Sequence, residues 1–178
     1  MDQKMMRLCI RVIQPEEIKK ITERNQTTRL DEYLKSLSKE EITKIMADQS
    51  AVFDIIQRLQ SLLDTEYSAV YGGFYNGELI SYVALTEIID STEGKKTNTA
   101  EIHVEVLPEY HGQGFGFEML SRVIEMVFSE TVYPFLNYTV IPSNVVSIAL
   151  VEKLGGVLQE PKSYAEEMLL RTYHLNRK

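Results

Sequence analysis

A glycine-rich loop between an extended segment and a helical segment constrains this chain more than any other feature. The loop reads His-Gly-Gln-Gly-Phe-Gly over residues 111–116, after the strand-like run Ala100–Leu107 and before the amphipathic run Phe115–Phe128. Glycine at alternate positions leaves little side chain on the loop, so backbone N–H groups can approach a ligand closely. A helix that follows such a loop adds the positive end of its dipole. The combination predicts a site for phosphate oxygens.

Two common phosphate loops do not fit this stretch. A P-loop needs Lys directly after its last glycine, whereas Phe117 follows Gly116. A dinucleotide-binding loop needs a third glycine where this chain has Phe117 or Met119. The stretch instead reads His-x-x-Gly-x-Gly after Pro108-Glu109-Tyr110, and it resembles the acetyl-CoA loop of the GNAT superfamily of N-acetyltransferases, Gln/Arg-x-x-Gly-x-Gly/Ala. His111 departs from the family pattern, which has Gln or Arg.

A second stretch resembles the other cofactor motif of that superfamily. Residues 144–155 read Asn-Val-Val-Ser-Ile-Ala-Leu-Val-Glu-Lys-Leu-Gly and match Asn-x-x-Ser/Ala…Leu-x-Glu-Lys-Leu-Gly. The resemblance extends from Ser68 to the C-terminus, and the residues around Glu101 and the glycine loop are most similar to the ribosomal-protein N-acetyltransferase branch.

The resemblance implies acetyl-CoA as co-substrate and assigns residues to it. In the family, the strand before the glycine loop separates from its neighbour, and the pantetheine arm of the cofactor fills the gap. The backbone groups of Val104 and Val106 would then bind the pantetheine arm, and the N–H of Val104 could also polarise the thioester carbonyl. The full set of residues expected at the cofactor is Val104, Val106, His111, Gly112, Gln113, Gly114, Phe115, Gly116, Asn144 and Ser147.

The strand before the loop also carries the candidate catalytic residues. Glu101, His103 and Glu105 alternate with Ile102, Val104 and Val106, so the two sets occupy opposite faces. A central strand of an α/β sheet is normally apolar on both faces. The polar line therefore indicates either an edge strand with a solvated face or a face that opens onto a substrate groove. In the second case its members are general-base candidates, and the resemblance favours Glu101.

The general acid is harder to assign. Many family members have Tyr just before the Glu-Lys of the second motif, whereas this chain has Val151. Tyr138, Tyr164 and Ser147 are the substitutes, and Tyr138 is our first choice. Each also has a purely structural interpretation: packing in a strand for Tyr138, a surface loop for Tyr164 and a hydrogen bond at a helix start for Ser147. A further alternative is that the protein has no dedicated general acid.

Composition limits the partners. The chain has 178 residues, enough for one domain over residues 1–178, and a formal net charge of −7. This charge argues against nucleic acid and favours a cationic acceptor, although acidic surfaces also simply keep proteins soluble. The single cysteine, Cys9, fits a reducing cytoplasm, and no apolar run reaches the length of a membrane span. No metal-ligand spacing is present, so no metal site is expected. The sequence leaves open whether the protein forms a homodimer.

Hydrophobic periodicity and turn signals predict alternating strands and helices. The expected strands are Met6–Gln14, Ala69–Tyr75, Glu78–Glu87, Ala100–Leu107, Phe135–Ile141 and Met168–Leu175. Helices are expected over residues 29–64 and 115–128, and two more are expected to begin at Pro15 and Asn144. Residues Asp90–Asn98 are expected to form a loop. The resemblance implies an α/β fold with a mixed, mostly antiparallel sheet of six to seven strands and helices on both faces. It implies an acetyl-CoA-dependent N-acetyltransferase acting on a primary amine, of a small molecule or a protein N-terminus. The alternative is a non-catalytic domain that binds acyl-CoA as a sensor or structural partner.

Overall fold

A tight turn sets the register of the first half of the sheet. Asn76 and Gly77 have φ angles of 51° and 84°, the left-handed pair that a two-residue hairpin turn requires. The turn joins β2 (Ala69–Tyr75) to β3 (Glu78–Ile89), which pair antiparallel. The structure is a computed structural model that describes residues 6–19, 21, 29–53, 55, 67–89 and 95–178.

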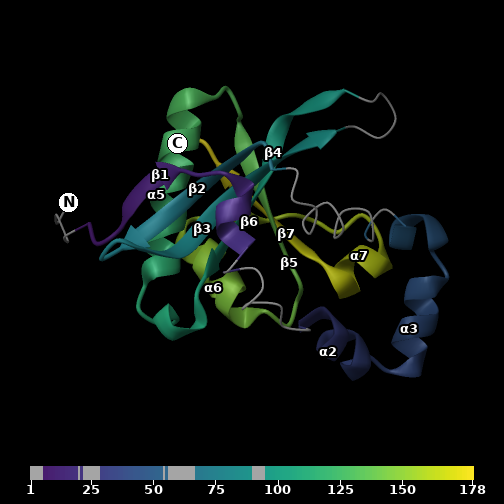
Figure 1. Cartoon of the computed structure of the whole chain (residues 1–178). Coiled ribbons are helices and arrows are strands. Elements are labelled where there is room, and N and C mark those ends of the chain that lie inside the picture. The colour runs from purple at the N-terminus through teal and green to yellow at the C-terminus, as the bar shows by residue number, and fades with distance from the viewer. Residues whose placement is uncertain (1–5, 20, 22–28, 54, 56–66, 90–94) are drawn as a thin grey trace.

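The sheet has seven strands in the order β1-β2-β3-β4-β5-β7-β6 (Figure 1). Among the strands of the described residues, only the β4–β5 pair is parallel, so the sheet is mixed and mostly antiparallel. This confirms the fold class predicted from the sequence. The remaining strands are β1 (Cys9–Val12), β4 (Lys96–Val106), β5 (Phe135–Val140), β6 (Val157–Leu158) and β7 (Arg171–Asn176).

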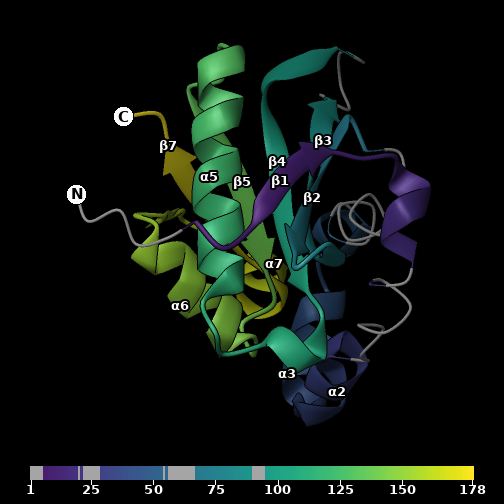
Figure 2. The same cartoon turned by 60° about the vertical axis from the view of Figure 1, so that its left-hand side comes forward.

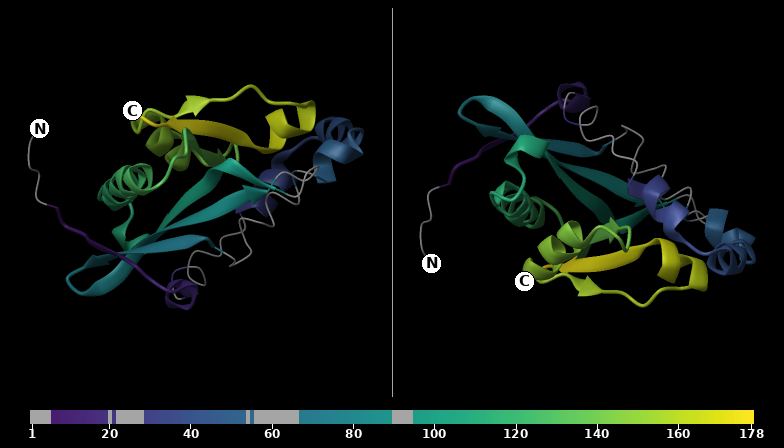
Figure 3. Two further views of the ribbon diagram at one scale, coloured as in Figure 1. Left: turned by 90° about the horizontal axis from the view of Figure 1, so that it is seen from above. Right: turned by 90° about the horizontal axis from the view of Figure 1, so that it is seen from below.

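The sheet separates between β4 and β5. Over the described lengths of both strands, their parallel pairing is confined to Ala100 with Leu136 and Glu101 with Asn137. β5 by contrast pairs with β7 along its whole length. Figure 3 shows the two halves of the sheet diverging, with α5 (Phe115–Glu130) and α6 (Val145–Lys153) in the angle between them.

Helix α5 is held against the sheet by an apolar stripe. Phe115, Met119, Leu120, Val123 and Val127 are buried against the sheet, and α5 stands against β3 and β4 (Figure 2). Burial of each such side chain contributes about 1.5–3 kcal/mol relative to exposure. The helix start is therefore fixed to the end of β4 by the core as well as by the loop.

A second, smaller apolar cluster lies at the other end of the molecule, where α2, α3 and α7 gather (Figure 1). Ile45 of α3 meets Ala165 and Leu169 of α7 there. The remaining helices and short 3-10 turns are η1 (Pro15–Ile18), α2 (Arg29–Ser36), α3 (Lys39–Met46), η2 (Pro108–Tyr110) and α7 (Tyr164–Leu169). No helix in the described part of the chain is both long and apolar enough to cross a membrane.

The helical stretch expected over 29–64 is divided into separate helices, and the Ser38-Lys-Glu-Glu41 sequence forms the capping box that its pattern predicts. The chain breaks after Ser36, and the Ser38 hydroxyl accepts a bond from the Glu41 N–H at 3.2 Å, so a new helix starts at Lys39. Helix resumes over 49–53, and the rest of the expected segment lies largely outside the described residues. The cap that starts α3 thus also ends the previous helix, because an N-cap residue adopts an extended conformation.

The expected strand Met168–Leu175 is wrong at its start. Residues Tyr164–Leu169 form α7, capped by the Ser163 hydroxyl, which accepts a bond from the Glu166 N–H at 3.1 Å. Two smaller differences concern β4, which begins at Lys96 inside the expected loop, and β1, which is shorter than expected. Strand β6 was not predicted, because two exposed residues show no periodicity.

Candidate active site

The glycine loop leaves β4 with the conformation that its glycines allow. Gly112 and Gly114 have φ angles of 71° and 83°, in the left-handed region that favours glycine. Gly114 is the N-cap of α5 and brings no side chain to the helix start. A Cβ on Gly116 would lie 3.6 Å from Val106 Cγ2, an ordinary contact, so only the first two glycines are needed for backbone conformation. The N–H groups that open α5 are thus left for a ligand.

Side chains of the loop hold its own backbone. His111 Nε2 lies 2.7 Å from the Val106 carbonyl oxygen, and Gln113 Nε2 donates to the Glu109 carbonyl at 3.0 Å. The His111 ring thus closes the loop onto the end of β4.

The backbone of β4 beyond Glu101 faces the gap between the strands. The Leu107 N–H bonds to the Ile80 carbonyl of β3 at 2.8 Å. Alternate residues of an antiparallel strand point their N–H and C=O groups to opposite sides. Val104 and Val106 therefore direct theirs away from β3, toward the side on which the pairing with β5 has ended.

The strand that carries the polar face, β4, is an internal strand of the sheet. β4 lies between β3 and β5, so the edge-strand alternative is wrong. Glu101 is only 5% exposed and lines a groove of about 1950 Å³ together with Thr99 and Asn137. The far wall of the groove comes from α7 and from Tyr33 of α2. A buried carboxylate on the wall of a groove is placed to meet a polar ligand.

Two tyrosines that sequence reasoning missed complete this face. Tyr82 of β3 is fully buried opposite Glu105, and Tyr67 lines the groove. Tyr82 forms hydrogen bonds with Glu105 and with Tyr67. Its pKa is raised far above the usual value, mainly by burial and secondly by the Glu105 charge. The strand register pairs Tyr82 with Glu105, and this long-range information is absent from either local segment.

His103 belongs to the same cluster but is a weak base. Its Nε2 lies 3.4 Å from the Tyr82 hydroxyl, and its ring packs against Tyr67 and Tyr82 with centroid separations of 5.3 and 5.5 Å. Burial lowers the pKa of His103 to about 4, so the ring is neutral at pH 7. Its Nδ1 is buried and has no hydrogen-bond partner among the described residues.

Tyr138 bonds to Ser147 and lies within reach of the Glu101 charge, at the point where β4 and β5 separate. Tyr138 is 4% exposed; burial raises its pKa, the Glu101 charge adds to this, and a hydrogen bond with Ser147 opposes it. Because Glu101 pairs with Asn137, the next residue, Tyr138, lies on the opposite face of the sheet. The Ser147 N–H bonds to Asn144 Oδ1 at 3.2 Å, so Asn144 caps α6. Tyr164 lies apart, at the start of α7.

Comparisons with known proteins agree on one family. The model of the Acetyltransferase (GNAT) family matches residues 30–156. A curated relative, the SPbeta prophage-derived uncharacterized N-acetyltransferase YokL of Bacillus subtilis (strain 168), is 39% identical over 61 residues, which is 34% of each chain. The match thus spans about a third of that relative's length.

Two solved structures share the fold. One is yncA, a putative acetyltransferase of Salmonella typhimurium with its cofactor acetyl-CoA (TM-score 0.55, 18% identity, 97% of this chain and 96% of that chain). The other is the ribosomal-protein-S18-alanine N-acetyltransferase of Escherichia coli (TM-score 0.58, 14% identity, 96% of both chains). At these identities the likeness shows the fold.

Proposed function

The chain belongs to the acetyltransferase (GNAT) family, and from this premise we propose that it transfers the acetyl group of acetyl-CoA to a primary amine held in the groove beside Glu101. One observation carries the proposal. Glu101 and Tyr138 lie on opposite faces of the sheet at the point where β4 and β5 stop pairing. A base on the acceptor side and an acid on the other side is the arrangement that acyl transfer from a thioester to an amine needs.

The residues around the gap fit acetyl-CoA. The N–H groups of the glycine loop and the start of α5 suit a pyrophosphate, because they combine free donors with the positive end of a 16-residue helix. The outward backbone groups of Val104 and Val106 suit the amides of a pantetheine arm, which would lie beside β4 as an added strand. Asn144 and Ser147 contribute by capping α6 and by bonding Tyr138. When bound, acetyl-CoA supplies the activated acetyl group.

Glu101 is the proposed general base. An amine enters the groove mostly as an ammonium ion, and Glu101 takes one proton from it so that the nitrogen lone pair can attack the acetyl carbon. Such a base contributes about 10²–10⁴ in rate. Glu101 ranks above Glu105 because it lines the groove, whereas Glu105 interacts with Tyr82.

Tyr138 is the proposed general acid. As the carbon–sulfur bond breaks, its hydroxyl gives a proton to the departing sulfur. Burial raises the Tyr138 pKa, so the hydroxyl is protonated at neutral pH and available to donate. The hydrogen bond with Ser147 fixes the orientation of the Tyr138 hydroxyl. The N–H of Val104 is the proposed donor that polarises the acetyl carbonyl.

The groove favours a cationic acceptor. Acidic residues outnumber basic ones on its wall, which contains five glutamates and Asp48 but, as basic residues, Lys162 and Arg171. This local charge has the same sign as the net charge of −7. The acceptor is either a small amine or the N-terminus of a protein; the name of the Escherichia coli structure given above describes the second kind.

One feature favours a non-catalytic alternative. Val151 is fully buried at the position where many family members have Tyr, so that residue supplies no acid. A domain without an acid could bind acyl-CoA as a sensor. Release of the free CoA thiol in the presence of primary amines and N-terminal peptides separates the two functions. We expect amine-dependent release by the wild-type protein; acetyl-CoA binding without release with any amine would support the sensor.

A further inference from the structure

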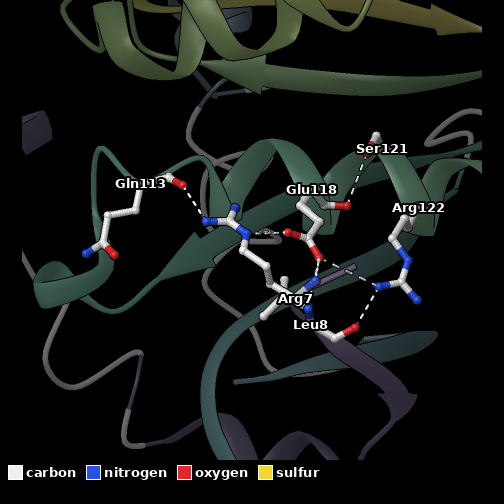
Figure 4. A network of polar contacts seen from close by, with 6 residues as sticks. All are labelled: Arg7, Leu8, Gln113, Glu118, Ser121 and Arg122. Atoms are coloured by element: carbon white, nitrogen blue, oxygen red, sulfur yellow. Dashed lines mark hydrogen bonds and ion pairs between the residues drawn. The ribbon is translucent and has the colours of Figure 1, made fainter. Parts of the chain in front are cut away.

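Arg7, which precedes β1, reaches across to the glycine loop (Figure 4). Its Nη1 donates to the Gln113 carbonyl at 2.9 Å, and its Nε donates to Glu118 Oε2 at 3.0 Å. The guanidinium carbon also lies 4.1 Å from the centre of the Phe115 ring. One side chain thus contacts the middle of the loop, the first residue of α5 and the first turn of that helix.

The bond to Gln113 fixes the direction of the next N–H. A peptide group is planar and trans, so its C=O and its N–H point in opposite directions. Because the Gln113 carbonyl points at Arg7, the Gly114 N–H points away from Arg7. The side of Gly114 on which a Cβ would stand also faces Arg7, since that atom would lie 3.5 Å from Arg7 Nη2.

Arg7 also counters a charge that opposes anion binding. Glu118 lies in the first turn of α5, where its carboxylate would repel a pyrophosphate at the helix start. The carboxylate is instead engaged by the segment before β1. Besides Arg7 Nε, the backbone N–H groups of Arg7 and Leu8 donate to Oε1 at 2.9 Å each, and Arg122 Nη1 lies 3.9 Å from the same oxygen.

From these contacts we propose that Arg7 is a positioning residue of the phosphate loop. It holds the Gln113–Gly114 peptide so that the Gly114 N–H faces the phosphate side, and it offsets the Glu118 charge, without touching the cofactor. The proposal rests on the acetyl-CoA site proposed above and adds the segment before β1 to it. A guanidinium suits this task because its donors are arranged as a rigid fork, which an ammonium group lacks.

The test compares ligands with and without phosphate. The variant Arg7→Ala is titrated with CoA by calorimetry and with pantetheine, which carries no phosphate, by NMR. We expect the dissociation constant for CoA to rise about tenfold or more, as for loss of a charge-assisted hydrogen bond, and that for pantetheine to stay within about twofold. Arg7→Lys should resemble Arg7→Ala, and it serves as the second variant should Arg7→Ala fail to fold.

Arg11→Ala is the matched control. Arg11 lies within β1, four residues after Arg7, and its contacts are with Glu17 at 3.1 Å and with the Phe74 ring, away from the glycine loop. Its affinity for CoA should equal that of the wild type. An unchanged affinity for CoA in folded Arg7→Ala, or an equal loss for CoA and pantetheine, would overturn the positioning role. Failure of the wild-type protein to bind CoA would instead count against the acetyl-CoA site itself.

Discussion

The proposed cofactor side and the proposed acceptor side of this enzyme use different chemical groups. The cofactor side uses backbone groups: the glycine loop, the start of α5 and the outward edge of β4. The acceptor side uses side chains from distant segments, among them Tyr33, Tyr67, Glu101 and those of α7. Backbone geometry depends on short motifs, whereas a wall of side chains can change at each position independently. One common cofactor and a variable acceptor are therefore compatible within one fold.

The largest effect is expected at the groove. Glu101→Gln removes the proposed base and keeps the shape of the side chain, so turnover should fall about 10²-fold or more near neutral pH. The defect should shrink at high pH, where the amine is already deprotonated. Turnover measured from pH 6 to pH 10, with acetyl-CoA affinity as a parallel readout, tests this.

Glu105→Gln is the matched control for Glu101. Its carboxylate is on the same face of β4 but interacts with Tyr82, so we expect a smaller loss of turnover. Equal losses in both variants would mean that the polar face works as one unit, and a pH-independent loss in Glu101→Gln would indicate substrate positioning instead of base catalysis.

The next largest effect is expected at Tyr138, the proposed general acid. Tyr138→Phe should lower turnover about 10–10²-fold with little change in acetyl-CoA affinity, because it removes the proton donor and keeps the ring. Tyr173→Phe is the control: Tyr173 pairs with Tyr138 across β5 and β7, and its hydroxyl bonds to Glu152 at 3.1 Å. Full turnover in Tyr138→Phe over the whole pH range would exclude Tyr138 as the acid.

The same contrast explains which parts of the structure could be predicted from the sequence. The hairpin at Asn76 and Gly77, the loop glycines and the Asn144 cap were all correctly located, since each depends on a few neighbouring residues. The Tyr82–Glu105 pair and the contacts of Arg7 with Gln113 were not foreseen. These depend on strand register and on a separation of 106 residues along the chain.

The acceptor side was also where local prediction was wrong. The six residues of α7 are too few to show a helical period, and their helix is fixed by the Ser163 cap and by packing of Ala165 and Leu169 against α3. Burial of Glu101 likewise required knowledge that β4 is central in the sheet. Tertiary contacts, absent from any short window, decided both features.

A smaller effect is expected on the cofactor side. Gly114→Ala forces a side chain into a φ of 83°, which costs about 1–3 kcal/mol for a residue other than glycine. Acetyl-CoA affinity should therefore fall about tenfold, because the loop relaxes away from this conformation. Gly116→Ala is the control, since its added Cβ has only ordinary contacts at 3.6 and 3.7 Å. Titration calorimetry on both variants would separate them, and equal affinities would show that the loop's dihedral angles are unimportant.

The smallest effect concerns the buried polar cluster behind the groove. The His103 pKa of about 4 lies below its ordinary value of 6.5, so the unfolded chain binds more protons than the native protein between these pH values. Stability is then complete above pH 6.5 and declines as the pH falls toward 4. Because His103 is only half-buried, we expect a loss of only about 1–2 kcal/mol. Urea unfolding at pH 7 and pH 5 measures it, and His103→Gln should flatten the difference. An identical pH dependence in that variant would assign the loss to other groups, and His103 would then be as readily protonated as an exposed histidine.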